Sequence, residues 1–124
     1  NMKRVLVLFL WLSSSLQDEL TADRTQLAAD GKDLAYITVK VTDKNGNLCP
    51  NDRRLIKFSV KRNGSYRASV NGDPTSLDLF HLPQMHVFNG MLTTIVQAGE
   101  AAGKLTLEAK AFGIKSGKLE VTTK

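Results

Sequence analysis

Hydrophobic and polar residues alternate in several short segments of the chain after residue 16. In residues 35–42, the apolar side chains of Ile37, Val39 and Val41 are separated by polar ones. Successive side chains of a β-strand point to opposite faces, so this two-residue period predicts a strand with one buried face. The same period recurs in residues 56–61, 105–111 and 118–122.

Four other segments have strand-like compositions. Residues 91–98 are apolar on both faces, which predicts a central strand of a sheet. Residues 20–25 are expected to form the first strand, and residues 65–70 and 77–80 to form weaker ones. Asn-Gly and Asp-Gly turn signals recur about every ten residues between these segments. No segment after Ser15 combines a sustained helical period with helix caps.

This pattern predicts an all-β fold. About seven antiparallel strands within residues 17–124 are expected to form two sheets that pack face to face. The 124-residue chain is long enough to bury one hydrophobic core. Its single cysteine, Cys49, forms no internal disulfide, so the fold must be stable without one.

Residues 1–16 differ from the rest of the chain. Two basic residues precede an apolar run that ends at three serines, which is the layout of a secretory signal and predicts a periplasmic or extracellular location. The apolar run is too short to span a bilayer as a helix. Because Asn1 precedes the methionine, we also expect the segment to pack on the domain as an extra apolar strand or to join two copies. The residues predicted to form this homo-oligomer contact are Val5, Leu6, Val7, Leu8, Phe9 and Leu10.

The charge of the chain changes this picture little. There are 17 basic and 12 acidic residues, a net charge of +5, and most basic residues are spread singly. One group of basic residues lies close together in the sequence. We expect this group to form a solvated strand face rather than a phosphate site, because lysines on exposed strands protect against aggregation. Its members are Arg53, Arg54, Lys57, Lys61, Arg62 and Arg67. We therefore predict no nucleic-acid partner.

Residues that carry chemistry do not form a known catalytic or metal-binding pattern. Glu108 and Glu120 occupy outward strand positions, where a solvated or cross-strand charge is expected rather than a catalytic pair. His81 and His86 are five residues apart without a third ligand, so zinc is not expected. The pairs Asp30 with Asp33 and Asp73 with Asp78 supply too few oxygens for calcium. The sequence thus predicts no catalytic residue, metal or cofactor.

Aromatic rings are the remaining candidates for a binding site. Sugars stack on exposed aromatic faces, and Tyr66 and Phe80 are the candidate carbohydrate-binding residues. Phe88 precedes an Asn-Gly turn and is expected in the core.

A series of motifs in order resembles a known family. It runs from Leu20-Thr21-Ala22-Asp23-Arg24-Thr25 through residues 29–39 and 56–60, Asn71-Gly72-Asp73-Pro74 and Phe88-Asn89-Gly90 to residues 95–99 and 103–107. The series is similar to the C-terminal immunoglobulin-like domain of glycoside hydrolase family 2 enzymes, in particular bacterial β-galactosidases of Bacteroides-type organisms.

The resemblance implies an immunoglobulin-like β-sandwich that acts as a non-catalytic accessory domain. In such enzymes the catalytic glutamates lie in a separate barrel domain, so no catalytic residue is carried over to this chain. The implied partners are the catalytic and other domains of a parent glycosidase. The alternative is a surface module of the bacterial invasin-like type that binds carbohydrate, such as a polysaccharide, or protein.

Overall fold

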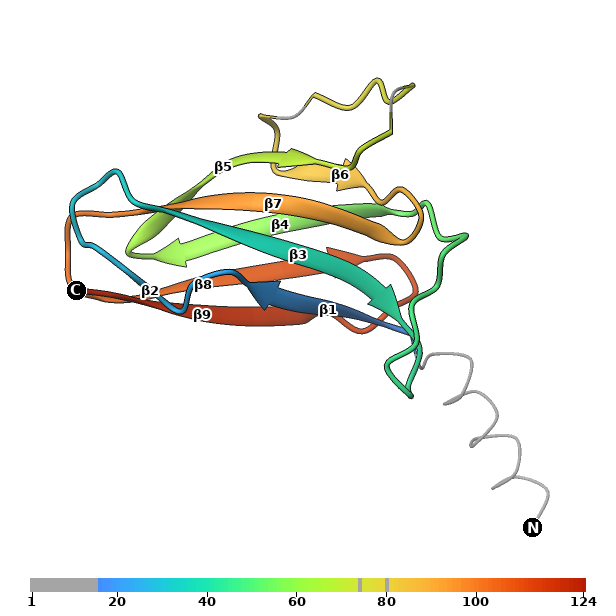
Figure 1. The fold of residues 1–124 in the computed structure, drawn as a ribbon, viewed down its shortest axis with the longest axis horizontal. Coiled ribbons are helices and arrows are strands. Elements are labelled where there is room, and N and C mark those ends of the chain that lie inside the picture. Colours follow the sequence, from blue (N-terminus) through green and yellow to red (C-terminus); the bar gives the residue numbers. More distant parts are fainter. Residues whose placement is uncertain (1–15, 74, 80) are drawn as a thin grey trace, which may run out of the picture.

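The computed structural model describes residues 16–73, 75–79 and 81–124, which form strands and no helix (Figure 1). One sheet has the strand order β1-β3-β7-β5 and the other has the order β2-β9-β8-β4-β6. The strands are β1 (Gln17–Ala22), β2 (Gln26–Leu27), β3 (Leu34–Thr42), β4 (Leu55–Arg62), β5 (Gly64–Val70), β6 (Gln84–His86), β7 (Met91–Ala98), β8 (Gly103–Ala111) and β9 (Gly117–Thr123). The predicted immunoglobulin-like β-sandwich is confirmed.

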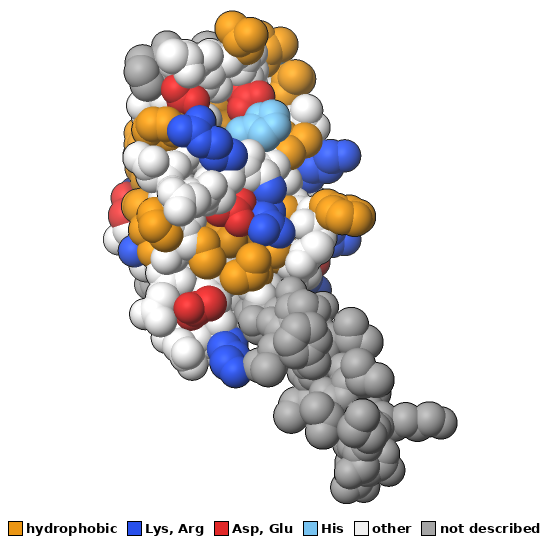
Figure 2. Space-filling model, turned by 90° about the vertical axis from the view of Figure 1, so that its right-hand side faces the viewer, with side chains coloured by type: hydrophobic (Ala, Val, Ile, Leu, Met, Phe, Trp, Pro, Cys, Tyr) orange, Lys and Arg blue, Asp and Glu red, His pale blue; other side chains and the backbone are white. Residues whose placement is uncertain are grey.

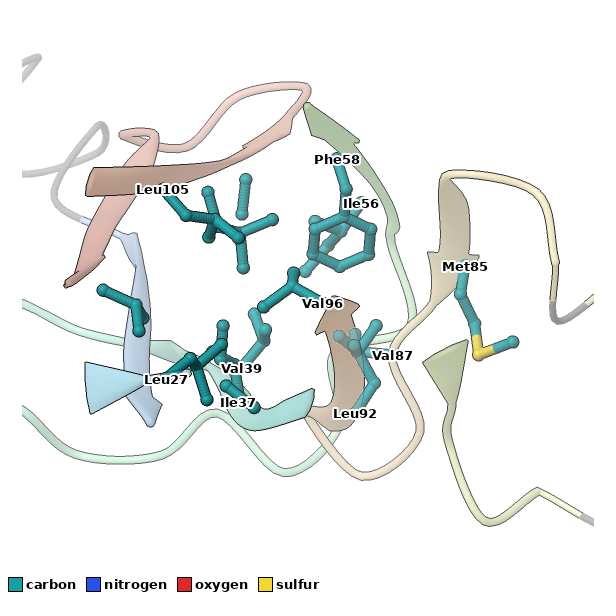
Figure 3. Close-up of a cluster of buried hydrophobic side chains, with 14 of the residues drawn as sticks. Leu27, Ile37, Val39, Ile56, Phe58, Met85, Val87, Leu92, Val96 and Leu105 are labelled. Atoms are coloured by element: carbon teal, nitrogen blue, oxygen red, sulfur yellow. The ribbon is translucent and has the colours of Figure 1, made fainter. Parts of the chain in front are cut away.

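Alternating residues of both sheets fill the space between them. In β3, Ile37 and Val39 are fully buried, and the register places Val39 opposite Leu92 of β7. In the other sheet, Leu105 and Leu107 of β8 are fully buried. Figure 3 shows side chains of the two sheets pointing toward one another in a shared core. The two-residue period of the sequence therefore corresponds to the faces that are buried.

The central-strand prediction for residues 91–98 is also confirmed. Strand β7 has the predicted bounds and lies between β3 and β5. Its inward residues are buried and its outward residues are half-buried. This accounts for apolar side chains on both of its faces.

Four details of the strand prediction are wrong. Residues 77–79 form no strand, because polar contacts within the loop fold it back on itself, as when Thr75 donates its backbone N–H to Asp73. Short strand β6 follows this loop and pairs with β4, which sequence analysis missed. The first strand begins at Gln17 instead of residue 20, and β2 pairs with β9 in parallel rather than antiparallel orientation. Seven longer strands and two short ones thus make up the described sandwich.

Residues 1–15 lie outside the described part of the chain. The signal-like or extra-strand role of residues 1–16 and the contact through Val5 to Leu10 therefore stay predictions. Among the described residues there is no helix with the length and apolar character needed to cross a membrane.

Candidate functional site

The end of the sandwich at which the described chain begins gathers apolar and charged side chains (Figure 2). We call it the Leu16 end. The backbone N–H of Lys115 donates to the carbonyl of Leu16 at 2.8 Å, and Asp18 donates back to Lys115 at 3.1 Å. The N–H of Gly90 donates to the carbonyl of Asp52 at 3.2 Å. These contacts bring the start of β1 and the loops 43–54, 87–90 and 112–116 together.

An ion pair stabilises the Leu16 end. The Arg54 Nε lies 2.9 Å from each carboxylate oxygen of Asp52, and its Nη2 lies 2.8 Å from Oδ2. Burial opposes ionisation of Asp52, but the hydrogen bonds from Arg54 outweigh this effect and hold its pKa below the usual value. The remaining Arg54 nitrogen, Nη1, donates to the carbonyl of Phe112 at 3.0 Å. One guanidinium thus joins two loops that are distant in sequence.

The turn after β8 presents an aromatic ring to solvent. The side chain of Phe112 is 97% exposed. The next residue, Gly113, has a φ of +78°, a conformation that glycine adopts without steric cost. Because Arg54 holds the Phe112 carbonyl, the backbone beneath this exposed ring is anchored.

A buried carboxyl group lies near the same ion pair. Asp18 is only 5% exposed, and neither of its side-chain oxygens has a hydrogen-bond partner. Burial raises its pKa to about 7, while Arg54 lowers it and Asp52 raises it further. The alternation of β1 places Asp18 on the same inward face as Leu20, which packs against the core. Asp18 therefore carries a proton that is easily lost near neutral pH.

A cleft of about 330 Å³ lies beside the loop between β5 and β6. His86 donates its backbone N–H to Asp78 at 2.9 Å, and its Nδ1 lies 3.0 Å from the same carboxylate. Burial opposes ionisation of Asp78, but these contacts with His86 hold its pKa below the usual value. Asn71 donates to the carbonyl of His86 at 2.9 Å. Most polar groups of the cleft thus bind one another and fix the loop.

The structure describes one of the two predicted carbohydrate-binding residues. The ring of Tyr66 is half-buried and stacks on Phe58, with centroids 6.0 Å apart. Its hydroxyl lies 2.7 Å from that of Ser69 in a hydrogen bond, and burial raises its pKa. Phe80 lies outside the described residues. Sugar binding by this pair therefore stays a prediction.

The predicted basic concentration divides into separate environments. Lys57, Lys61, Arg62 and Arg67 are exposed, as expected for a solvated strand face. Arg54, however, is part of the ion pair with Asp52, which sequence analysis did not foresee. The guanidinium carbon of Arg53 lies 5.2 Å from the centre of the half-buried Phe88 ring.

The glutamates on the outer face of the larger sheet contact lysines. Glu108 lies 3.4 Å from Lys110 and 3.6 Å from Lys118. Burial opposes its ionisation, but both lysines favour it and its pKa is lowered. Glu120 lies 3.4 Å from Lys104. Lys118 and Lys104 contact these glutamates across strands, as the alternation predicted, whereas Lys110 lies on the same strand as Glu108. Among the described residues no group of three acidic, histidine or cysteine side chains is placed to hold a metal.

Sequence comparison identifies relatives among sugar-cleaving enzymes. Residues 19–120 match the family described as glycoside hydrolase family 2 C-terminal domain 5. A β-galactosidase of Bacteroides ovatus, BoGH2A, is 38% identical over 103 residues, which are 83% of this chain and 12% of that enzyme. A β-glucuronidase of Formosa agariphila is 31% identical over 88 residues, which are 70% of this chain and 9% of that protein. The chain spans only a small part of the length of both relatives.

Solved structures show the same sandwich. A glycosyl hydrolase family 2 member from Bacteroides cellulosilyticus superposes with a TM-score of 0.85 at 28% identity, covering 87% of this chain and 14% of that protein. A C-terminal fragment of intimin superposes with a TM-score of 0.58 at 19% identity, covering 85% of this chain and 32% of the fragment. At that identity the likeness to intimin extends to the fold alone.

Proposed function

Because the chain belongs to the glycoside hydrolase family 2 C-terminal domain 5 family, we propose that it is a non-catalytic accessory domain of a β-galactosidase-type glycoside hydrolase. The observation that carries this proposal is the match of residues 19–120, nearly the whole sandwich, to a family defined by its place at the C-terminus of such enzymes. The proposed role is to support the arrangement of the other domains. The same sandwich in a B. cellulosilyticus family member supports this role.

The placement of the carboxylates supports a non-catalytic role. Glycoside hydrolysis in most families uses two carboxyl groups, one of which must carry a proton at the working pH. The pKa of Glu108 is instead lowered by its contacts with Lys110 and Lys118, and Glu120 lies 3.4 Å from Lys104. Asp18 keeps its proton only below its pKa of about 7, and its oxygens are enclosed at the end of the core. We therefore propose that a parent enzyme supplies the catalytic pair from another domain.

A domain exchange in the B. ovatus β-galactosidase tests the proposed function. Three purified forms are compared: the intact enzyme, a form lacking its matching segment, and a hybrid with residues 16–124 of this chain in that place. A cooperative melt of isolated 16–124 is established first. We expect the hybrid to regain most of the thermal stability that the deletion removes, and the isolated chain to leave a nitrophenyl β-galactoside intact.

Two outcomes contradict the proposal. A hybrid no more stable than the deletion form argues against an accessory role. Hydrolysis by the pure chain that disappears in Glu108→Gln or Glu120→Gln argues against a non-catalytic one.

Three finer proposals are supported by the sequence alone. We propose a periplasmic or extracellular location, because basic, apolar and serine-rich segments follow one another in residues 2–15. A polysaccharide partner would use Tyr66 and Phe80. Self-association would use Val5, Leu6, Val7, Leu8, Phe9 and Leu10.

A further inference from the structure

Phe112 is an apolar side chain that the sandwich itself does not use. It is 97% exposed, whereas Leu105 and Leu107 of the preceding strand β8 are fully buried. A ring left in water forfeits the hydrophobic free energy that its burial would provide. Since the core does not use this ring, Phe112 is available for a contact outside the described sandwich.

The turn that carries Phe112 is held in place before any partner binds. Arg54 donates from Nη1 to the Phe112 carbonyl, and Asp52 holds the other nitrogens of the same guanidinium. The side chain of Asp52 is only 8% exposed, so this anchor is fixed within the protein. An aromatic side chain on an anchored backbone loses little conformational freedom on binding, which is the property of strong interface anchors.

The position of the turn indicates which partner covers it. Lys115, three residues after Phe112, is hydrogen-bonded to both Leu16 and Asp18 at the start of β1. In the C-terminal domain family, the rest of a long enzyme precedes this domain, and the chain matches 12% of the B. ovatus β-galactosidase. Polypeptide that precedes residue 16 in such an enzyme therefore arrives beside Phe112. Leu48, in the loop 43–54 at the same end, is 38% exposed, and Figure 2 shows apolar side chains on this face of the molecule.

We propose that the Phe112 turn is the anchor by which this domain docks on the preceding part of a glycoside hydrolase, with the ring seated in an apolar pocket of that partner. This inference rests on the proposed function. It adds the contact surface and its chemistry: one aromatic ring, presented by the Asp52–Arg54 ion pair, with Leu48 at the margin.

Hydrogen exchange in the hybrid enzyme tests the proposal. We expect amides of residues 111–116 to exchange about tenfold more slowly in the hybrid than in the isolated 124-residue chain. Phe112→Ala should return these amides to the faster rate. Because the ring is exposed, this change leaves the core intact, and a melt of the isolated variant checks that. Tyr36→Ala is the matched control, since Tyr36 is also an exposed aromatic residue. It lies near the start of β3, about 20 Å along the strand from Thr42 at the Leu16 end.

The outcomes separate this proposal from the proposed function. A hybrid that regains stability while its Phe112 turn exchanges as in the isolated chain overturns the docking surface and leaves the accessory role standing. A hybrid that fails to regain stability contradicts the accessory role itself, and the docking proposal with it. Light scattering that shows a wild-type dimer and a Phe112→Ala monomer would assign the surface to a second copy. Protection already present in the isolated chain and lost when it starts at Leu16 would assign it to residues 1–15.

Discussion

At the scale of single residues, Asp18 is the least expected group of the described structure. A carboxyl group buried without hydrogen-bond partners is stable only when protonated, because its charge would lose the solvation that water provides. Its pKa of about 7 in the folded protein lies well above 3.8, the ordinary value for an aspartate. The unfolded chain therefore releases this proton at lower pH than the folded protein does.

Asp18→Asn should change how stability depends on pH. In the wild type, Asp18 lowers the free energy of unfolding progressively as pH rises from about 4 to about 7. The amide cannot ionise, so the variant should match the wild type near pH 4 and exceed it at pH 8 by at most about 4 kcal/mol, the full linkage value of this pKa difference. Urea unfolding at both pH values measures the difference.

A matched change checks that the effect belongs to the buried group. Asp43 is exposed and its carboxylate accepts the N–H groups of Asn45 and Asn47, which lower its pKa. Asp43→Asn should therefore show no gain in stability between pH 4 and pH 8. Parallel curves for wild type and Asp18→Asn would show that Asp18 is already ionised in the folded protein.

The residues of the Leu16 end illustrate how far the sequence can identify a site. The period of β1 places Asp18 with Leu20, so a strand predicted from residue 17 instead of residue 20 would have revealed an inward carboxyl group. Phe112 lies directly after a predicted strand and before a glycine, which is the only signal in the sequence that it stands in a turn. The Arg54 contact joins positions 58 residues apart, and no local pattern encodes it.

At the scale of the elements, close approach of two strands depends on a glycine at the start of β5. A Cβ atom added to Gly64 would lie 1.8 Å from a methyl carbon of the fully buried Leu105 and 2.8 Å from the carbonyl oxygen of Gln97. Gly64→Ala should therefore displace the β5 start from β8 and lower the free energy of unfolding by about 2–3 kcal/mol.

Thermal or urea unfolding of Gly64→Ala measures this cost. Ser65→Ala is the control, because Ser65 is the next residue of β5 and its side chain is exposed. The control should unfold within about 0.5 kcal/mol of the wild type. Equal stability of the two variants would mean that Leu105 can move aside without cost.

In the strands that were predicted correctly, the pattern of apolar residues in the sequence matches the pattern of burial in the structure. In β3 and β8 the two-residue period reflects one face on the core, and in β7 apolar side chains on both faces reflect its central place, so the pattern alone locates them. In the loop between β5 and β6, Leu77 and Leu79 show the same alternation but are exposed. In this loop the hydrogen bonds of Asp73 and Asp78 determine the backbone conformation, despite the strand-like alternation. Strand β6 has only three residues, which is too few to show a two-residue period in the sequence.

At the scale of the whole molecule, the described residues between 16 and 124 form a sandwich with a core of their own. The buried apolar residues of the core run from Leu27 to Val121, and the described strands of both sheets lie between Gln17 and Thr123. Since hydrophobic burial is the main source of folding free energy, residues 17–124 should contain nearly all of it. The predicted division of the chain at residue 16 thus has a physical basis that a truncation can test.

A chain that starts at Gln17 should unfold in one cooperative transition, with a melting temperature within a few degrees of the full chain. Removing Leu16 deletes one backbone hydrogen bond to Lys115, which is worth about 1 kcal/mol. Light scattering on both forms measures the second consequence: if Val5 to Leu10 join two copies, the full chain is an oligomer and the shorter one a monomer. A large loss of stability in the shorter chain would instead place residues 1–16 in the fold as an extra strand, and an unchanged oligomeric state would exclude self-association through them.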